Sequence, residues 1–255
     1  MTRVCAVSYL NTKPFLEGLK QAFDPGELAV DLRVPSACAE AFAQGQCELA
    51  LVPAASLLLL EEPQLLPHYC IGAEGQVDSV YLFSQVPIQE VETLNLDAHS
   101  MTSNALARIL LRELWQRPVA FTHHDWQQAI GGTTAGVVIG DKAVAAKAQY
   151  RYAYDLAAAW QQLTGLPFVF AVWVYEASRI SQPMLARILA AFAQGLARRQ
   201  QVARQWAPRF SLSEEQARHY LEHSISYNLD AAKQQALDLF LQKAKPLMQI
   251  GQADR

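Results

Sequence analysis

The feature that most constrains the fold is a regular alternation of short apolar segments with amphipathic helical segments. In the first part of the chain, apolar segments at 4–7, 28–34 and 49–52 alternate with helical patterns at 15–23 and 37–44. Strand, helix and strand at this spacing predict parallel strands joined by right-handed crossovers. This part of the chain is therefore expected to form an α/β lobe.

The same alternation restarts further along the chain. Apolar segments at 94–98, 119–122 and 136–139 are expected to be strands, and helical patterns occur at 105–115 and 142–148. The two parts of the chain are alike in arrangement, because a strand runs into a polar turn and then a helix in both. This repetition predicts two related α/β lobes.

Two further apolar segments are placed as connections between the lobes. Residues 80–83 are expected to leave the first lobe, and the long apolar segment 168–175 is expected to return to it. From residue 183 the pattern is helical and is expected to end by Pro246. The apolar faces of these helices predict that they pack on lobe one.

These expectations give a discontinuous lobe one, 1–82 plus 172–255, and a lobe two, 83–171. Two lobes joined by two crossing strands, with a ligand cleft between them, are the architecture of the type II periplasmic binding proteins. The fold class is thus an α/β, two-lobed, type II periplasmic-binding-protein-like fold. It hosts both transport receptors and enzymes, so it does not settle function.

Composition excludes several kinds of partner. A net charge of -3, from 21 basic and 24 acidic residues, provides no basic face for nucleic acid. The four cysteines include no C-x-x-C pair and lie mostly in apolar segments, which favours free buried thiols in a reducing compartment and argues against a metal site.

The ends and the apolar runs of the sequence bear on location. The first residues show no basic region followed by an apolar export signal, and the run 54–60 is far shorter than the ~20 residues that a membrane helix needs. We expect a cytoplasmic protein with no membrane partner. No sequence feature defines its oligomeric state.

Small polar side chains gather in two strand-to-helix turns. They are Ser8, Asn11 and Thr12 in the first lobe, and Ser100, Thr102, Ser103 and Asn104 in the second. Helix N-termini present free N–H groups and favour anions, and two such ends facing one cleft predict a small dianionic ligand. The alternative, equally weighted for any single residue, is that these side chains only cap their helices.

Three further residues follow predicted strands directly. Asp141 could contact a ligand hydroxyl, although an N-cap is the commoner use of such a residue. His123 and His124 could offer a general base, but they belong to no wider constellation, and a capping or surface pair is favoured.

The sequence resembles the chorismate dehydratase family of the futalosine route to menaquinone. The resemblance spans nearly the whole chain and rests on five segments: Ser8-Tyr9-Leu10-Asn11-Thr12-Lys13-Pro14, Leu49-Ala50-Leu51-Val52-Pro53, Ser100 to Leu106, Ile139-Gly140-Asp141-Lys142-Ala143, and Tyr154-Asp155-Leu156 with Gly165 to Trp173. It implies a cofactor-independent carbon–oxygen lyase that removes water from chorismate to give 3-[(1-carboxyvinyl)oxy]benzoate. Chorismate is a small dianion, as the two polar turns predict.

The resemblance also implies roles for particular residues. Asn11 matches the functional asparagine of the family and is expected to orient or polarise the substrate, while Ser79 joins Ser100, Thr102 and Ser103 as a carboxylate-binding position. The proton acceptor stays open between the substrate's own enolpyruvyl carboxylate and a side chain such as His123 or His124. The sequence departs from the family after Pro53, where Ala54 stands in place of an expected serine and one anchoring hydroxyl is missing.

A second hypothesis comes from a different class. A non-catalytic solute-binding protein for a small carboxylate would have the same fold and the same anion-binding turns. Such a receptor must leave the cytoplasm, and the missing export signal favours the dehydratase instead.

Overall fold

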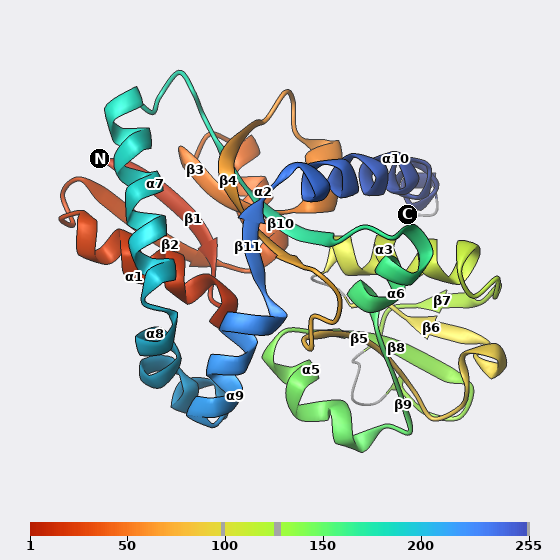
Figure 1. The fold of residues 1–255 in the computed structure, drawn as a ribbon. Helices are drawn as coiled ribbons and strands as arrows, with labels where there is room; N and C mark the ends of the chain where they lie inside the picture. Colours follow the sequence, from red (N-terminus) through yellow and green to blue (C-terminus); the bar gives the residue numbers. More distant parts are fainter. Residues whose placement is uncertain (98–99, 125–128, 254–255) are drawn as a thin grey trace. The chain divides into compact units, whose positions relative to one another are not determined.

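The computed structural model describes residues 1–97, 100–124 and 129–253, and the chain divides into two compact units. Unit 1 comprises residues 1–71 and 171–228, and unit 2 comprises residues 72–170 and 229–255. Figure 1 shows the order of the helices and strands along the chain. No helix among the described residues has both the length and the apolar character needed to cross a membrane.

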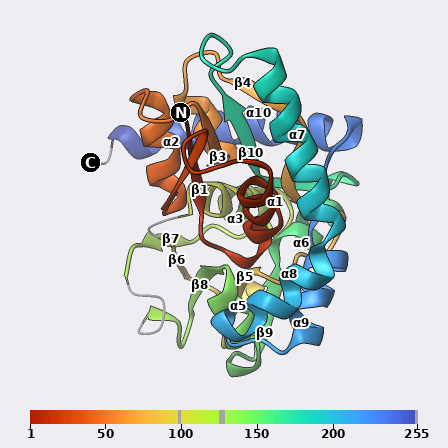
Figure 2. The same cartoon turned by 90° about the vertical axis from the view of Figure 1, so that its left-hand side faces the viewer.

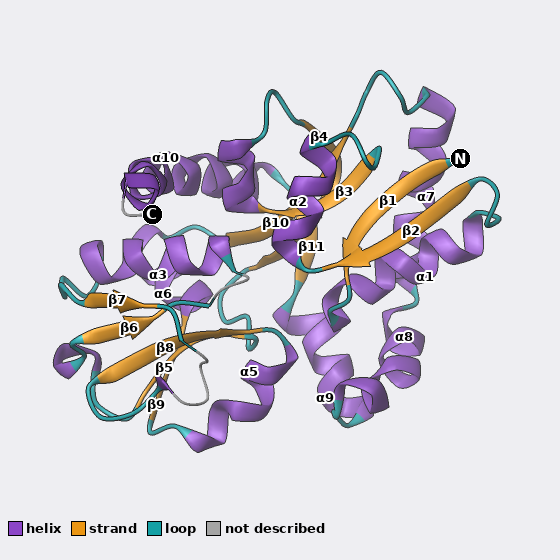
Figure 3. Cartoon of the chain, turned by 180° about the vertical axis from the view of Figure 1, so that it is seen from behind, coloured by secondary structure: helices purple, strands orange, loops and turns teal. Residues whose placement is uncertain are grey.

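Unit 1 is built on a six-stranded sheet in the order β11-β4-β10-β3-β1-β2. The elements that form it or pack on it are β1 (Thr2–Val7), α1 (Lys13–Ala22), β2 (Leu28–Arg33), α2 (Pro35–Ala43), β3 (Leu49–Pro53), β4 (Gln64–Ala73), β10 (Phe168–Tyr175), α7 (Gln182–Ala197), α8 (Arg199–Trp206), α9 (Glu214–His219) and β11 (Ser226–Leu229). β1 pairs in parallel with both β2 and β3, as the sequence predicts, and β10 pairs antiparallel with β3. Figure 3 shows β1 and β2 as neighbours.

Helices α1 and α7 cross at two glycines. A Cβ atom on Gly18 would lie 2.0 Å from the main-chain oxygen of Ala191, and one on Gly195 would lie 1.9 Å from that of Pro14. Only glycine permits this approach of two backbones. The contact fixes α1, and with it the polar turn at its N-terminus, against the helix that Figure 2 shows leading into α8 and α9.

Unit 2 has a five-stranded sheet in the order β7-β6-β8-β5-β9. Its elements are β5 (Val80–Ser84), β6 (Thr93–Asn95), α3 (Met101–Glu113), β7 (Ala120–Thr122), β8 (Thr134–Ile139), α5 (Asp141–Ala146), β9 (Tyr152–Asp155), α6 (Leu156–Thr164) and α10 (Ala231–Ala253). β6 pairs in parallel with β7 and β8, and β5 pairs antiparallel with β8. The central strands β1 and β6 thus have equivalent surroundings, which confirms the predicted repetition.

The connections between the units differ from the prediction. The boundaries fall inside β4 and β10, so the segment 80–83 does not cross; it is β5, an interior strand of the unit 2 sheet. The apolar run at 80–83 carried no sign of this, because a buried interior strand and a crossing strand have the same composition.

The final helix also differs from the prediction. α7, α8 and α9 belong to unit 1, but α10 belongs to unit 2 and continues past Pro246 to Ala253. Phe240 packs in unit 2 against Trp160 and Phe168, with ring centroids 6.2 and 5.1 Å away. Lys243 adds an ion pair to Glu113 at 2.5 Å.

The cysteines behave as the sequence predicts. Cys5, Cys38, Cys47 and Cys70 are all buried free thiols. Burial raises the pKa of Cys38 to about 12, which keeps this thiol protonated. These residues serve packing in unit 1 rather than thiolate chemistry.

Candidate functional site

The polar turn of unit 1 follows the central strand β1. It contains a 3₁₀ turn (Leu10–Thr12), in which the N–H of Thr12 donates to Tyr9 O at 3.1 Å. Because β1 lies between two parallel partners that run to either side, its carboxyl end is a topological switch point, where open α/β sheets bind ligands. Ser8 is exposed there and Asn11 is half-buried.

The expected helix cap at Thr12 does not form. Thr12 precedes α1 but already has a helical backbone, and its side chain makes no capping bond. Its hydroxyl instead donates to Asn11 Oδ1 at 3.2 Å. The 3₁₀ turn explains this, since it continues into α1 without the extended residue that an N-cap needs.

Lys13 places a buried cation directly behind this turn. Its side chain is 2% exposed, its Nζ donates to Ser8 Oγ at 3.0 Å, and the same nitrogen lies 4.4 Å from the centre of the Trp206 ring. A buried ammonium is costly unless hydrogen bonds and aromatic faces compensate it. The cation therefore polarises Ser8, whose oxygen is occupied as an acceptor and whose O–H can donate to an anion.

Asn11 is held by two tyrosines from the last part of the sequence of unit 1. Its Nδ2 donates to the hydroxyl of Tyr220 at 3.1 Å, and the hydroxyl of Tyr227 donates to its main-chain oxygen at 3.0 Å. Burial raises the pKa of Tyr227 well above its usual value, so this hydroxyl stays a donor. Both tyrosines lie more than 200 residues from Asn11 in the sequence, so no local sequence pattern predicts the contact.

The corresponding turn of unit 2 joins β6 to α3 and is closed by Asn104. The side-chain amide donates to Asp97 O at 2.7 Å, and its oxygen accepts from Asp97 N at 3.0 Å. The Asp97 carboxylate is itself paired with Lys142 at 2.9 Å. These contacts give Asn104 a role in holding the turn.

The hydroxyl residues of unit 2 lie in the first turn of α3 rather than in a loop. The helix begins at Met101, four residues earlier than predicted, and Ser100 occupies the N-cap position without a side-chain capping bond. Ser100, Thr102 and Ser103 are all buried. Hydroxyls at a helix N-terminus join the positive end of the dipole and suit a carboxylate.

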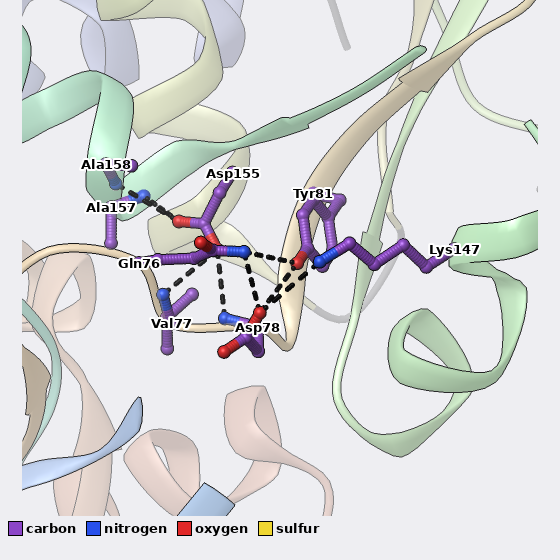
Figure 4. A network of polar contacts seen from close by, with 8 residues as sticks. All are labelled: Gln76, Val77, Asp78, Tyr81, Lys147, Asp155, Ala157 and Ala158. Carbon is purple, nitrogen blue, oxygen red and sulfur yellow. Dashed lines mark hydrogen bonds and ion pairs between the residues drawn. The ribbon is translucent and has the colours of Figure 1, made fainter. Parts of the chain in front are cut away.

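Ser79 is positioned by a buried carboxylate in unit 2. Asp155 accepts from the N–H groups of Val77 and Asp78 at 3.0 and 2.9 Å, and it caps α6 through Ala157 and Ala158, as Figure 4 shows. Asp78 takes the left-handed conformation (φ 61°), and Ser79 O accepts from Gly140 N at 2.7 Å. Ser79 is thereby fixed beside the start of α5.

The remaining predicted residues fall in different settings. Asp141 is the first residue of α5, whose N-cap is Gly140 rather than Asp141. His123 and His124 are exposed after β7, as a surface pair would be. Ala54 is fully buried at the start of a 3₁₀ turn in unit 1, so that turn has no hydroxyl where the family would place one.

Both units therefore present residues suited to anions. Unit 1 offers Asn11, Ser8 and a buried cation, and unit 2 offers Ser79 with the hydroxyls of α3. Among the described residues, no group of three His, Cys, Asp or Glu side chains is arranged to hold a metal ion. The chemistry available in each unit is binding and polarisation of an anionic ligand.

Comparison with known proteins gives a family match and a named relative. A family model described as menaquinone biosynthesis matches residues 2–246. A protein of Thermus thermophilus named chorismate dehydratase is 28% identical over 226 residues, which cover 81% of this chain and 83% of the relative.

Solved structures are similar in fold at low sequence identity. A protein of Archaeoglobus fulgidus superposes with a TM-score of 0.75 at 14% identity, covering 96% of this chain and 97% of that chain. The periplasmic aliphatic sulphonate binding protein of Escherichia coli gives 0.66 at 12% identity, covering 100% and 94%. A Candida albicans protein with the generic periplasmic binding protein fold gives 0.64 at 8% identity, covering 99% and 90%. These similarities confirm the predicted fold class.

Proposed function

The chain belongs to the menaquinone biosynthesis family, and we propose that within it the chain is a chorismate dehydratase. The similarity to the Thermus thermophilus enzyme over four-fifths of the chain carries this proposal. The polar residues of both units support it, because they suit a small substrate with two carboxylates. A cytoplasmic location belongs to the same proposal and rests on the relationship to a biosynthetic enzyme.

The proposed reaction is an elimination of water. A proton leaves the ring carbon that carries the enolpyruvyl ether, and the hydroxyl leaves the adjacent carbon. The electron pair of the broken C–H bond completes the aromatic ring of 3-[(1-carboxyvinyl)oxy]benzoate. Because aromatisation favours the product, the protein has mainly to position and polarise the substrate.

We assign Asn11 to the reacting part of the substrate. Its amide is half-buried and held at both ends, so it can orient a leaving hydroxyl or an ether oxygen without reorganising. Ser8, Thr12 and Lys13 serve the same patch in unit 1. In unit 2 we assign carboxylate binding to Ser79, Ser100, Thr102 and Ser103, with Asn104 as structural support for the turn, and we propose that Asp141 contacts a substrate hydroxyl.

The proton acceptor in this proposal is the enolpyruvyl carboxylate of the substrate. His123 and His124 are exposed after β7, and His124 contacts the side chain of Asn95 through its main chain. If a histidine were the base, replacing His123 and His124 together by glutamine would abolish turnover. We expect the double variant to keep turnover within about threefold of wild type.

Incubation of the purified protein with chorismate tests the function directly. We expect a product lighter by one water, resolved by chromatography and mass spectrometry, and we expect Asn11→Ala to lower kcat by about 10²-fold or more. Chorismate binding without a dehydrated product would instead favour the solute-binding alternative. If the protein neither binds nor dehydrates chorismate, both the dehydratase and the solute-binding function are overturned.

A further inference from the structure

A π-helical turn brings a tyrosine to Asn11. The turn spans Tyr220–Ser224 and follows α9 without a break, and Tyr220 is its first residue. Its ring is buried, at 6% exposure, and its hydroxyl accepts from Asn11 Nδ2 at 3.1 Å. π-helical turns are rare and occur frequently at functional sites.

Hydrogen bonds hold both ends of the Asn11 side-chain amide. Thr12 Oγ1 donates to the amide oxygen at 3.2 Å, whereas Tyr220 accepts from the amide nitrogen at 3.1 Å. The side-chain amide is therefore restrained by a hydroxyl at each end. The main chain of Asn11 is held separately, by the hydroxyl of Tyr227.

From this geometry we propose that Tyr220 is the positioning residue of Asn11 and acts on the reaction only through the Asn11 amide. The inference rests on the proposed function of Asn11. Without the Tyr220 hydroxyl the amide loses one of its two restraining contacts, and a polarising group that must be reoriented during the reaction is less effective. The effect should therefore appear in kcat more than in KM.

A double-mutant cycle tests this proposal. Tyr220→Phe should lower kcat about 10-fold or more and change KM less than about threefold, but in an Asn11→Ala background it should lower kcat less than about twofold. Tyr175→Phe, in β10, serves as the matched control with wild-type kinetics. An unchanged kcat in Tyr220→Phe, or an equal loss in both backgrounds, would contradict the proposal.

A second readout does not depend on catalysis. The side-chain amide signals of Asn11 in a ¹H–¹⁵N spectrum, identified by their loss in Asn11→Ala, should move towards those of a free asparagine in Tyr220→Phe and stay in place in Tyr175→Phe. Signals that stay unchanged in Tyr220→Phe overturn the positioning role. If wild-type protein fails to dehydrate chorismate while the signals move as expected, the proposed function is wrong but the positioning of Asn11 by Tyr220 is confirmed.

Discussion

The β1–α1 turn of unit 1 and the β6–α3 turn of unit 2 occupy equivalent places in equivalent sheets, yet they carry opposite buried charges. Behind the first lies the ammonium of Lys13, satisfied by Ser8 and the ring of Trp206. Behind the second lies the carboxylate of Asp97, neutralised by Lys142. A repeated topology thus fixes where a turn lies, while non-local partners decide its electrostatic character.

The two turns are also held differently. The turn of unit 1 depends on distant residues, namely the two tyrosines and the glycine crossing of α1 with α7. The turn of unit 2 is held by its own neighbours, through the reciprocal bonds of Asn104 to Asp97. We therefore expect the first turn to respond to remote substitutions and the second to respond mainly to local ones.

The largest expected effect comes from Gly18→Ala. A Cβ there meets backbone rather than a flexible side chain, so α1 must move away from α7. We expect the free energy of unfolding to fall by about 3 kcal/mol or more, measured by chemical or thermal denaturation. Gly26→Ala is the control, because a Cβ at Gly26 meets nothing within 4 Å. Equal stability of the two variants would refute the close crossing.

Lys13→Met tests the role of the buried charge behind the β1–α1 turn. Methionine keeps the length of the side chain but removes the charge and the bond to Ser8. Since a hydrogen bond to a charged group is worth about 1.5–3 kcal/mol, we expect kcat/KM for chorismate to fall about 10–100-fold. Lys20→Met, an exposed position on the same helix, should match wild type. A Lys13→Met enzyme with wild-type kcat/KM would show that the buried cation serves stability alone.

Ser103→Ala and Asn104→Ala separate binding from support in the turn of unit 2. Loss of a carboxylate-binding hydroxyl should raise KM about 3–10-fold with little change in stability. Loss of the Asn104 amide removes two bonds to Asp97 and should lower the free energy of unfolding by about 1–3 kcal/mol. Steady-state kinetics and denaturation of both variants measure the split. If the two variants behave alike, the division of roles between these neighbours is wrong.

Sequence patterns predict well the features of this molecule that depend on residues close together in the sequence. The strands around β1 and the repetition in unit 2 follow from apolar periodicity. Sequence patterns do not identify Lys13, Tyr220 and Tyr227 as functional residues. These residues act through contacts between positions far apart in the sequence, and Tyr220 also depends on a π-helical turn that no periodicity encodes. The prediction that the last helix packs on lobe one is wrong for a similar reason, since an apolar helix face does not indicate which surface it packs against.

The smallest expected effect concerns two buried carboxylates that differ between the units. Glu48 in unit 1 is buried, which acts to raise its pKa, but bonds from Arg3 and pairing with Arg179 outweigh burial and hold the pKa below its usual 4.5. Asp155 in unit 2 accepts instead from four main-chain N–H groups, and burial raises its pKa despite these donors.

The contribution of Glu48 is therefore complete above pH 4.5 and is lost as the pH falls through its lowered value in the folded state. Because both arginines are partly exposed, we expect Glu48→Gln to cost only about 0.5–1 kcal/mol at pH 7. Denaturation between pH 3 and pH 7 should show the difference from wild type shrinking on the acid side. A difference that stays constant over this range would mean that Glu48 contributes by packing rather than by charge, and the electrostatic contrast with Asp155 would not hold.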